Sequence, residues 1–517
     1  MLEKNNNFKN ILKSLLFFPL IFYFGKRSFI AFDEGFYALQ ARWILEKGNW
    51  IIPLWWDEYV LDRTNGLQIL IAQSQTIFGK NLFSIYLPTT TAAIIMLVLT
   101  YKLHEEFFNK NHAIISPLIL ATTYIWFDYS HLATQDLIYS CLVTVGVFSL
   151  VKIKTKKSKF YILLFGIWIG LAFMMKTFLV AVPLAALIPY ICTKKHLFLT
   201  KFFWLGLIIG FIPFLTWAYY INSYLDQNII FYLLGKFQYL SQKNNFTNPF
   251  YYYIWNIPIT FLPWSIFSII GLISNTIENK NNKLVLTYFP LILILIISIF
   301  STKTPYYPLQ ISSILSLNSY LGMKYLFSSK KYKSIAVFIT SKLIPLLTIT
   351  VVITYMIFLR SELNFTLKEN TYTILGLILF AVTWSFIKDT NNIQEVFITL
   401  IIGPYLLTSL LLQSGLFTDR SRELRETMEY LSSLDILKNQ IIKVDKNNIE
   451  KEMAQSKIIR ISLLTPNLGD SIDSIDKLNV SELAWSALSS KEVSQNDSYQ
   501  IIYDFKILSP WKLIRKN

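Results

Sequence analysis

The side chains best suited to chemistry are carboxylates that gather in one short stretch of the chain. Of 32 acidic residues, 15 follow residue 414, and six of the other 17 lie within 30 residues of one another. Carboxylates are costly in so apolar a sequence, which is 53% hydrophobic, so this cluster indicates a functional site. The cluster consists of Asp33, Glu34, Glu46, Asp57, Glu58 and Asp62.

The acids Asp33 and Glu34 follow the first apolar segment directly and open a helix-like stretch, Gly35–Leu45. Acids at a helix N-terminus are electrostatically favourable, so the pair could have a purely structural role. The same pair could instead form part of a site at the mouth of the first membrane span.

The stretch 48–66 combines acids with aromatic side chains and is too polar to cross a membrane. It suits a surface that lies in the membrane interface, anchored by Trp50, Trp55, Trp56 and Tyr59. A hard divalent cation could be ligated by Asp57, Glu58 and Asp62, although their spacing matches no known loop signature. Arg63 has the planar donor fork that suits a phosphate partner.

Polar residues interrupt the apolar segments at three further places. Asp136 lies where a helix is expected to start, so it could cap that helix or belong to a site. His131 lies close to Asp136, and a single histidine of this kind more often has a structural role than a catalytic one. Lys176 could extend its ammonium group to the interface, or it could face a phosphate. Lys303 and Tyr307 belong to Lys-Thr-Pro-Tyr-Tyr-Pro, which could set a helix start or line a polar site.

The elements that must position these residues are membrane spans. Only 15% of the residues are charged, compared with about 25% in soluble domains, and the mean hydropathy is +0.43. We therefore predict an all-α polytopic membrane protein with about thirteen spans of roughly 20 apolar residues. They are expected near residues 11–30, 84–106, 112–129, 133–151, 160–175, 177–193, 202–222, 252–273, 284–300, 305–327, 335–358, 371–387 and 393–413.

Lysine clusters predict how the chain is oriented. Positive residues favour the cytoplasmic side, and the net charge of +16 belongs entirely to residues 1–414. This bias accounts for the charge without a nucleic-acid partner. With a retained first span and a cytoplasmic N-terminus, the first outer loop (31–83) and the C-terminal tail face outward from the plasma membrane. The three lysine clusters that predict this orientation lie in residues 152–159, which include Lys156, and in residues 194–201 and 330–333.

The tail has a different composition, with 15 basic and 15 acidic side chains after residue 414. We predict a membrane domain over 1–414 and a small α/β domain over 415–517, which is within normal domain size. The tail pattern predicts a helix over 422–440 and β-rich stretches at 440–444, 457–464 and 499–507. The domain could stabilise the protein or help to bind an acceptor.

Acids, cations and aromatic residues that are far apart in sequence are thus expected on one outer face. That face lacks ATP and nucleotide sugars, and the sequence contains no phosphate-binding glycine loop. Group transfer there needs a donor that already carries its activation energy, such as a lipid-phosphate sugar held in the bilayer.

At these residues the sequence resembles the membrane glycosyltransferases of the GT-C fold, above all the ArnT-like and protein O-mannosyltransferase superfamily. The motifs cover about residues 11–325, and five of them occur in the family's order. They are Phe32-Asp33-Glu34-Gly35-Phe36-Tyr37, Gly48-Asn-Trp50 with Pro53 and Asp62-Arg63, Thr134-Gln-Asp136, Gly170-Leu-Ala-Phe-Met-Met-Lys176 and Lys303-Thr-Pro-Tyr-Tyr307.

The resemblance implies an inverting transfer from a polyprenyl-phosphate sugar to a lipid or glycan acceptor. Asp33 would activate the acceptor hydroxyl, and Glu34 and Asp136 would support that site. The leaving phosphate and the substrate would be held by Arg63, Lys176, Lys303, Tyr307 and Tyr59. Fixed cations in a dry site suit a developing phosphate dianion. A divalent cation at Asp62 is possible, and no cofactor is certain.

The sequence departs from the family pattern at three places. The family's Glu-Lys-Pro-Pro is Asp62-Arg63-Thr64-Asn65 here, the arginine of the second loop is Thr134, and Thr177 stands where a glycine follows the lysine. The donor sugar or its geometry could therefore differ.

Two rival functions remain. The first is a protein O-mannosyltransferase, which would differ in its acceptor. A large luminal domain of the β-trefoil type would favour a protein acceptor, and the sequence shows no such domain. A lipid flippase or transporter would often contain internal inverted repeats and broken mid-membrane helices. The sequence displays no such repeat, and its acids lie at the edge of the membrane rather than within spans.

Overall fold

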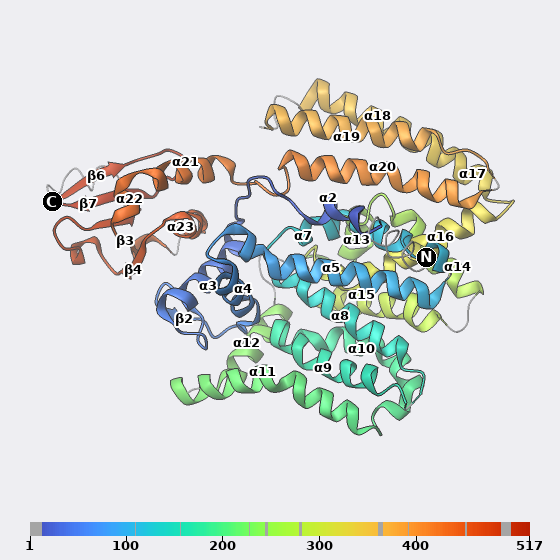
Figure 1. Ribbon diagram of the computed structural model, residues 1–517, viewed down its shortest axis with the longest axis horizontal. Coiled ribbons are helices and arrows are strands. Elements are labelled where there is room, and N and C mark those ends of the chain that lie inside the picture. Colours follow the sequence, from blue (N-terminus) through green and yellow to red (C-terminus); the bar gives the residue numbers. More distant parts are fainter. Residues whose placement is uncertain are drawn as a thin grey trace, which may run out of the picture. The chain divides into compact units, whose positions relative to one another are not determined.

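The protein forms two compact units in a computed structural model (Figure 1). The structure describes residues 13–108, 110–155, 157–226, 228–242, 247–278, 282–359, 365–390, 392–449, 452–487 and 498–517. We call residues 1–25, 62–64 and 89–417 the helical unit, and residues 26–61, 65–88 and 418–517 the loop–tail unit. Residues 11 and 12 of the first predicted span, and Lys156, lie outside the described residues.

The predicted spans correspond to a series of apolar helices. These are α2 (Phe18–Ile21), α5 (Leu82–Phe107), α6 (Ile115–Ala121), α7 (Tyr124–Ser130), α8 (Gln135–Lys152), α9 (Lys159–Lys176), α10 (Ala181–Ile191), α11 (Lys201–Leu225), α12 (Ile229–Ser241), α13 (Tyr252–Thr260), α14 (Ser265–Glu278), α15 (Phe289–Ile299), α16 (Ser312–Ser328), α17 (Lys333–Phe338), α18 (Ile344–Thr354), α19 (Leu367–Ser385) and α20 (Ile393–Ser414). Short 3₁₀ or π segments join them: η2 (Lys110–His112), η3 (Thr177–Val180), η4 (Cys192–Leu197), η5 (Leu284–Tyr288), η6 (Tyr307–Ile311), η7 (Ile339–Leu343) and η8 (Tyr355–Leu359).

The helices confirm a polytopic membrane protein, whereas the count of thirteen spans stays a prediction. Six helices in the described part of the chain are long and apolar enough to cross a membrane, or seven if the pair Tyr252–Thr260 and Ser265–Thr276, bent by 115°, is one span. The predicted span 112–129 is broken between α6 and α7. The described part of the first predicted span is not one helix, because the chain after α2 is extended.

Close packing of α9 on α11 fixes the position of α9. Figure 1 shows the two helices side by side. Gly166 and Gly170 of α9 meet Gly206 and Gly210 of α11, and a methyl group on any of the four would overlap the backbone of the opposite helix. Small residues four apart let helices approach closely in a membrane, where dispersion contacts replace the hydrophobic effect. The pair therefore holds Lys176, the last residue of α9, in a fixed place.

The loop–tail unit joins the first loop to the C-terminal tail. Its elements are η1 (Ala31–Gly35), α3 (Phe36–Lys47), β1 (Leu54–Trp55), β2 (Glu58–Tyr59), α4 (Gly66–Phe78), α21 (Arg422–Ser433), α22 (Asp435–Asn439), β3 (Ile442–Asp445), η9 (Lys446–Asn448), α23 (Glu452–Leu464), β4 (Leu468–Ile472), η10 (Ile475–Lys477), β5 (Leu483–Ser486), β6 (Tyr499–Tyr503) and β7 (Lys512–Lys516). The sheet order is β4-β3-β5-β7-β6. Strand β3 runs parallel to β4 and β5, and β7 runs antiparallel to β5 and β6.

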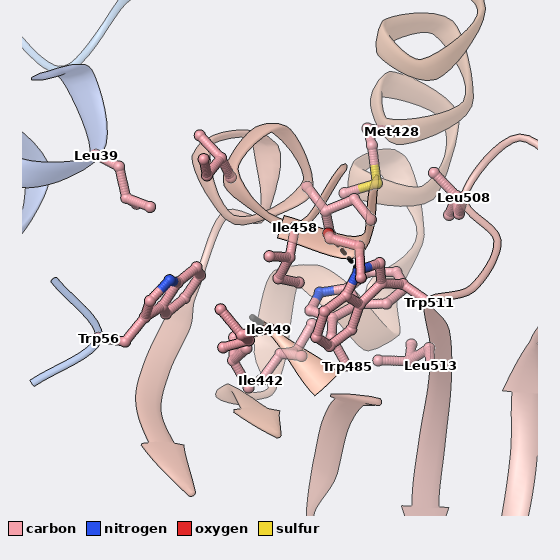
Figure 2. Packing of buried hydrophobic residues seen from close by; sticks show 14 of the residues in the cluster. Leu39, Trp56, Met428, Ile442, Ile449, Ile458, Trp485, Leu508, Trp511 and Leu513 are labelled. Carbon is pink, nitrogen blue, oxygen red and sulfur yellow. Dashed lines mark hydrogen bonds between the residues drawn. The ribbon is translucent and has the colours of Figure 1, made fainter. Parts of the chain in front are cut away.

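One apolar core serves both parts of this unit. Figure 2 shows Leu39 and Trp56 of the loop in the same cluster as tail residues such as Ile442, Ile458 and Trp485. A small α/β domain at the C-terminus was predicted and is confirmed, but its core also needs the loop. The boundary at residue 414 stays a prediction.

The expected strand at 457–464 is wrong, because these residues belong to α23. The fully buried positions Ile458, Ile459 and Ile461, with Ala454 one turn earlier, lie on one face at helical spacing. Tertiary packing of that face outweighs the strand preference of the β-branched isoleucines.

Thr177 directly after α9 adopts φ +50° and ψ −130°. A β-branched residue is a steric outlier at positive φ, and such strain costs about 1–3 kcal/mol. Glycine populates this region without a Cβ clash.

We therefore expect Thr177→Gly to stabilise the protein by about 1 kcal/mol, after the added flexibility of glycine is discounted. The thermal unfolding midpoint of the purified chain would rise. Thr177→Ala is the control, because alanine keeps a Cβ and should bring no comparable gain. A lower midpoint for the glycine variant would contradict the assignment of strain.

An acid-sensitive ion pair joins β3 to the turn before β5. Lys443 Nζ donates to Glu482 Oε2 at 2.7 Å, and the Asn479 backbone N–H donates to the same oxygen at 2.9 Å. The Lys443 hydrogen bond is the main cause that lowers the pKa of Glu482 from 4.5 to about 2. The ionised carboxylate is thus favoured in the folded state.

A depressed carboxylate pKa contributes stability above the unfolded-state pKa, and this contribution is lost as the pH falls from about 4.5 to about 2. Glu482→Gln should unfold at a lower temperature than the unaltered protein at about pH 6, and the two should converge towards about pH 2. Thermal unfolding of both proteins across this range measures the difference. A gap that is independent of pH would refute this prediction.

Candidate active site

The helical unit contains a pocket between α8, the end of α9 and the segment that precedes α16. It encloses about 470 Å³, including the open space at its mouth. Apolar side chains form one part of the wall and polar side chains the other. The lining comprises Asp136, Tyr139, Ser140, Lys176, Leu179, Val182, Ile297, Phe300, Thr302, Tyr306, Tyr307 and Gln310.

An ion pair between Lys176 Nζ and Asp136 Oδ1 lies in this wall, and each side chain is only 13% exposed. Lys176 also lies over the ring of Tyr306, with Nζ 5.0 Å from the centroid. Desolvation raises the cost of both charges, so either one would be expensive to leave without its partner. Asp136 is the second residue of α8, and its carboxylate contacts Lys176 instead of acting as an N-cap.

Several lining residues are fixed by contacts with the backbone. The Tyr139 hydroxyl donates to the Leu179 carbonyl at 2.9 Å, and Ser140 Oγ donates to the Asp136 carbonyl at 2.7 Å. Gln310 Nε2 donates to the Tyr307 carbonyl at 3.1 Å, while Gln310 Oε1 is buried and accepts no hydrogen bond from the described residues. The pocket thus offers one cation, hydroxyl groups and a buried acceptor to a bound molecule.

Three of these residues were missed in the sequence, although a helical signal was present. Tyr139 and Ser140 lie three and four positions after Asp136, which is the spacing that shares a helix face. Gln310 follows Tyr307 by three residues in η6. Tyr306 belongs to the predicted motif and is the tyrosine that contacts Lys176.

Lys303 is buried, with 4% exposure, and does not line the pocket. Its ammonium group donates to the carbonyls of Asn248, at 2.9 Å, and Phe300, at 2.6 Å. The Asn248 side chain donates back to the Lys303 carbonyl at 3.2 Å. These contacts fasten residues 247–248 to the segment before α16, and burial lowers the pKa of Lys303.

Arg63 forms a two-pronged pair with its neighbour Asp62. Its Nε and Nη2 donate to the two carboxylate oxygens at 3.0 and 2.9 Å. Among the residues that the structure describes, no three His, Cys, Asp or Glu side chains group as ligands for a metal ion. A divalent cation at Asp62 stays a prediction.

The two acids of the first loop lie in the loop–tail unit and differ sharply in burial. Glu34 is 1% exposed, and its Oε2 accepts the Ile30 backbone N–H at 2.9 Å. Asp33, one residue earlier in η1, is exposed. Tyr59 in β2 is 46% exposed. The structure thus brings Asp136, Lys176 and Tyr307 together in one pocket, and places Asp33, Glu34 and Tyr59 in the other unit.

Comparisons with known proteins agree with this architecture. A family model described as dolichyl-phosphate-mannose-protein mannosyltransferase matches residues 62–220. The chain is 29% identical over 330 residues to the undecaprenyl phosphate-alpha-4-amino-4-deoxy-L-arabinose arabinosyl transferase of Wigglesworthia glossinidia brevipalpis, which covers 59% of this chain and 57% of that relative. It is 26% identical over 302 residues to the protein of the same name from Photorhabdus laumondii, covering 55% and 54%. The chain therefore matches just over half the length of these relatives.

The fold has close counterparts among solved structures. ArnT from Cupriavidus metallidurans bound to undecaprenyl phosphate superposes with a TM-score of 0.75 at 13% identity, covering 98% of this chain and 96% of that chain. The same protein in the apo state also gives a TM-score of 0.75, at 12% identity. The predicted GT-C fold is thereby confirmed. Fold and sequence comparisons point to one group, because the chain is similar to ArnT-like GT-C membrane glycosyltransferases in both.

Proposed function

We propose that the protein transfers a sugar from a polyprenyl-phosphate donor to a lipid or glycan acceptor on the outer face of the membrane. The observation that carries the proposal is the desolvated Lys176–Asp136 pair in a pocket whose wall is partly apolar. An amphipathic donor needs such a site, with a cation for its phosphate and apolar side chains for its lipid. The names of the sequence relatives support the same donor class.

In the proposed reaction, the acceptor oxygen bonds to the anomeric carbon as the bond from that carbon to the phosphate oxygen breaks. The leaving polyprenyl phosphate takes the bonding electrons, and the acceptor proton passes to Asp33. This direct displacement inverts the configuration at the anomeric carbon. Lys176 and Tyr307 would stabilise the charge that develops on phosphate, because fixed donors in a dry pocket act strongly there. Arg63 could assist as a further phosphate partner.

The base assignment predicts that Asp33→Asn abolishes transfer, with a loss of at least about 10²-fold. Asp33 is exposed, so membrane level and folding should be unchanged. Transfer would be measured with undecaprenyl-phosphate 4-amino-4-deoxy-L-arabinose and membrane extract as acceptor. Glu58→Gln, which neutralises another exposed acid of the same unit, is the matched control and should remain active. Full activity of Asp33→Asn would refute the assignment.

The phosphate assignment predicts that Lys176→Met weakens binding of undecaprenyl phosphate about tenfold or more, because a charge-assisted hydrogen bond contributes about 1.5–3 kcal/mol. Asp136→Asn should retain binding, since it leaves the ammonium group in place. Native mass spectrometry of the purified chain with undecaprenyl phosphate measures both. Lys159→Met, at the other end of the same helix, is the control and should bind normally. Equal binding by the Lys176 and Lys159 variants would exclude the assignment.

A protein acceptor is the second candidate, favoured by the description of the matching family model. Mass spectrometry of glycans, lipids and proteins from a strain that lacks this chain separates the candidates. Loss of a sugar from a lipid or polysaccharide supports the first, and loss from proteins supports the second.

A further inference from the structure

Arg42 links the first loop to the tail within the loop–tail unit. It lies on α3, and its guanidinium donates to the carbonyls of Ser462 at 2.8 Å, Thr465 at 2.7 Å and Pro466 at 2.8 Å. These carbonyls belong to the last turn of α23 and the residues that follow it. A helix leaves its last carbonyls without intrahelical donors, and a guanidinium presents five N–H groups in a rigid fork. Arg42 therefore caps a tail helix from the loop.

Tail helix α23 also packs against the short segment that carries the acids. Gly35, the last residue of η1, would place a Cβ 2.7 Å from Ile459 Cγ2 and 3.2 Å from the Ile30 carbonyl oxygen. A side chain at this position would force the Ile459 side chain of α23 to shift. Residues 31–35, Asp33 among them, therefore form their π turn in direct contact with the tail.

A third set of contacts lies farther along the loop. Trp43 and Trp56 belong to the tail core, and Ser471 of β4 donates its hydroxyl to the Trp56 carbonyl at 3.3 Å. The Ser471 backbone N–H donates to Asp57 at 3.2 Å. Capping, close packing and core burial thus act at three separate places on the loop.

We infer that the C-terminal segment 418–517 is a positioning domain that holds the Asp33 loop in its working conformation, with Arg42 as the principal positioning residue. The inference rests on the proposed function, in which Asp33 activates the acceptor. It gives the tail a role in the acceptor step, and none in binding the donor, whose proposed phosphate ligands Lys176 and Tyr307 belong to the helical unit.

The variant Arg42→Met tests this inference in the full-length protein. It removes the fork and keeps an apolar stem of similar length. Hydrogen exchange of residues 31–47 should rise without added substrate. The kcat of transfer should fall about tenfold to a hundredfold, since small misplacements of a reacting group cost that much. The affinity for undecaprenyl phosphate should not change.

Two further variants make the result decisive. Arg42→Lys retains a cation with three donors and should recover part of the kcat. Lys443→Met breaks an ion pair that lies within the tail, and should leave both loop exchange and kcat unchanged. If Arg42→Met lowers the unfolding midpoint but keeps normal kcat and loop exchange, the tail is only a stabilising cap and the inference is overturned. Inactivity of the unaltered protein with the chosen donor would instead count against the proposed function.

Discussion

The ion pair between Lys176 and Asp136 imposes the strictest requirement on the helical unit. Both side chains are nearly withdrawn from solvent, so the free energy of each charge depends on the partner staying within contact distance. That distance depends on how α9 packs against α8, where Gly146 leaves room for the Trp168 ring of α9. The glycines at 166, 170, 206 and 210 in turn hold α9 closely against α11. Thr177 then carries the strain of a sharp turn directly after the lysine. Packing, strain and charge thus converge on the same few residues.

The loop–tail unit holds the polar first loop against the tail through one shared apolar core. The loop contains the two short strands β1 and β2 and the helices α3 and α4. A two-stranded hairpin is only marginally stable by itself in water, so the loop gains stability from further packing. The tail supplies the missing core, and the loop supplies Leu39, Trp43 and Trp56 in return. Segments almost 400 residues apart therefore share one apolar core.

Hydropathy and motif order predicted the membrane class and the fold. The motifs also predicted a larger site, of which Asp136, Lys176 and Tyr307 line one pocket, and the roles of these residues stay predictions. Apolar length decides where helices lie in a membrane, so these features are local in sequence. The failures have tertiary causes. Residues 457–464 form a helix because its buried face packs in the shared core. Lys303 turns inward to carbonyls that sequence cannot place beside it. Arg42 has no signature as a cap, because its acceptors are backbone atoms of a distant helix.

The adjacent acids Asp33 and Glu34 show how a fold can separate two similar groups. Glu34 is enclosed and accepts a backbone N–H from Ile30, which stabilises the turn that it belongs to. Asp33 projects from the same turn into an exposed position. Unlike environments give neighbouring carboxylates unlike roles. The buried acid stabilises the turn, whereas the exposed acid is accessible from solvent. Under the proposed function, the exposed acid would act in the reaction and the buried acid would support it.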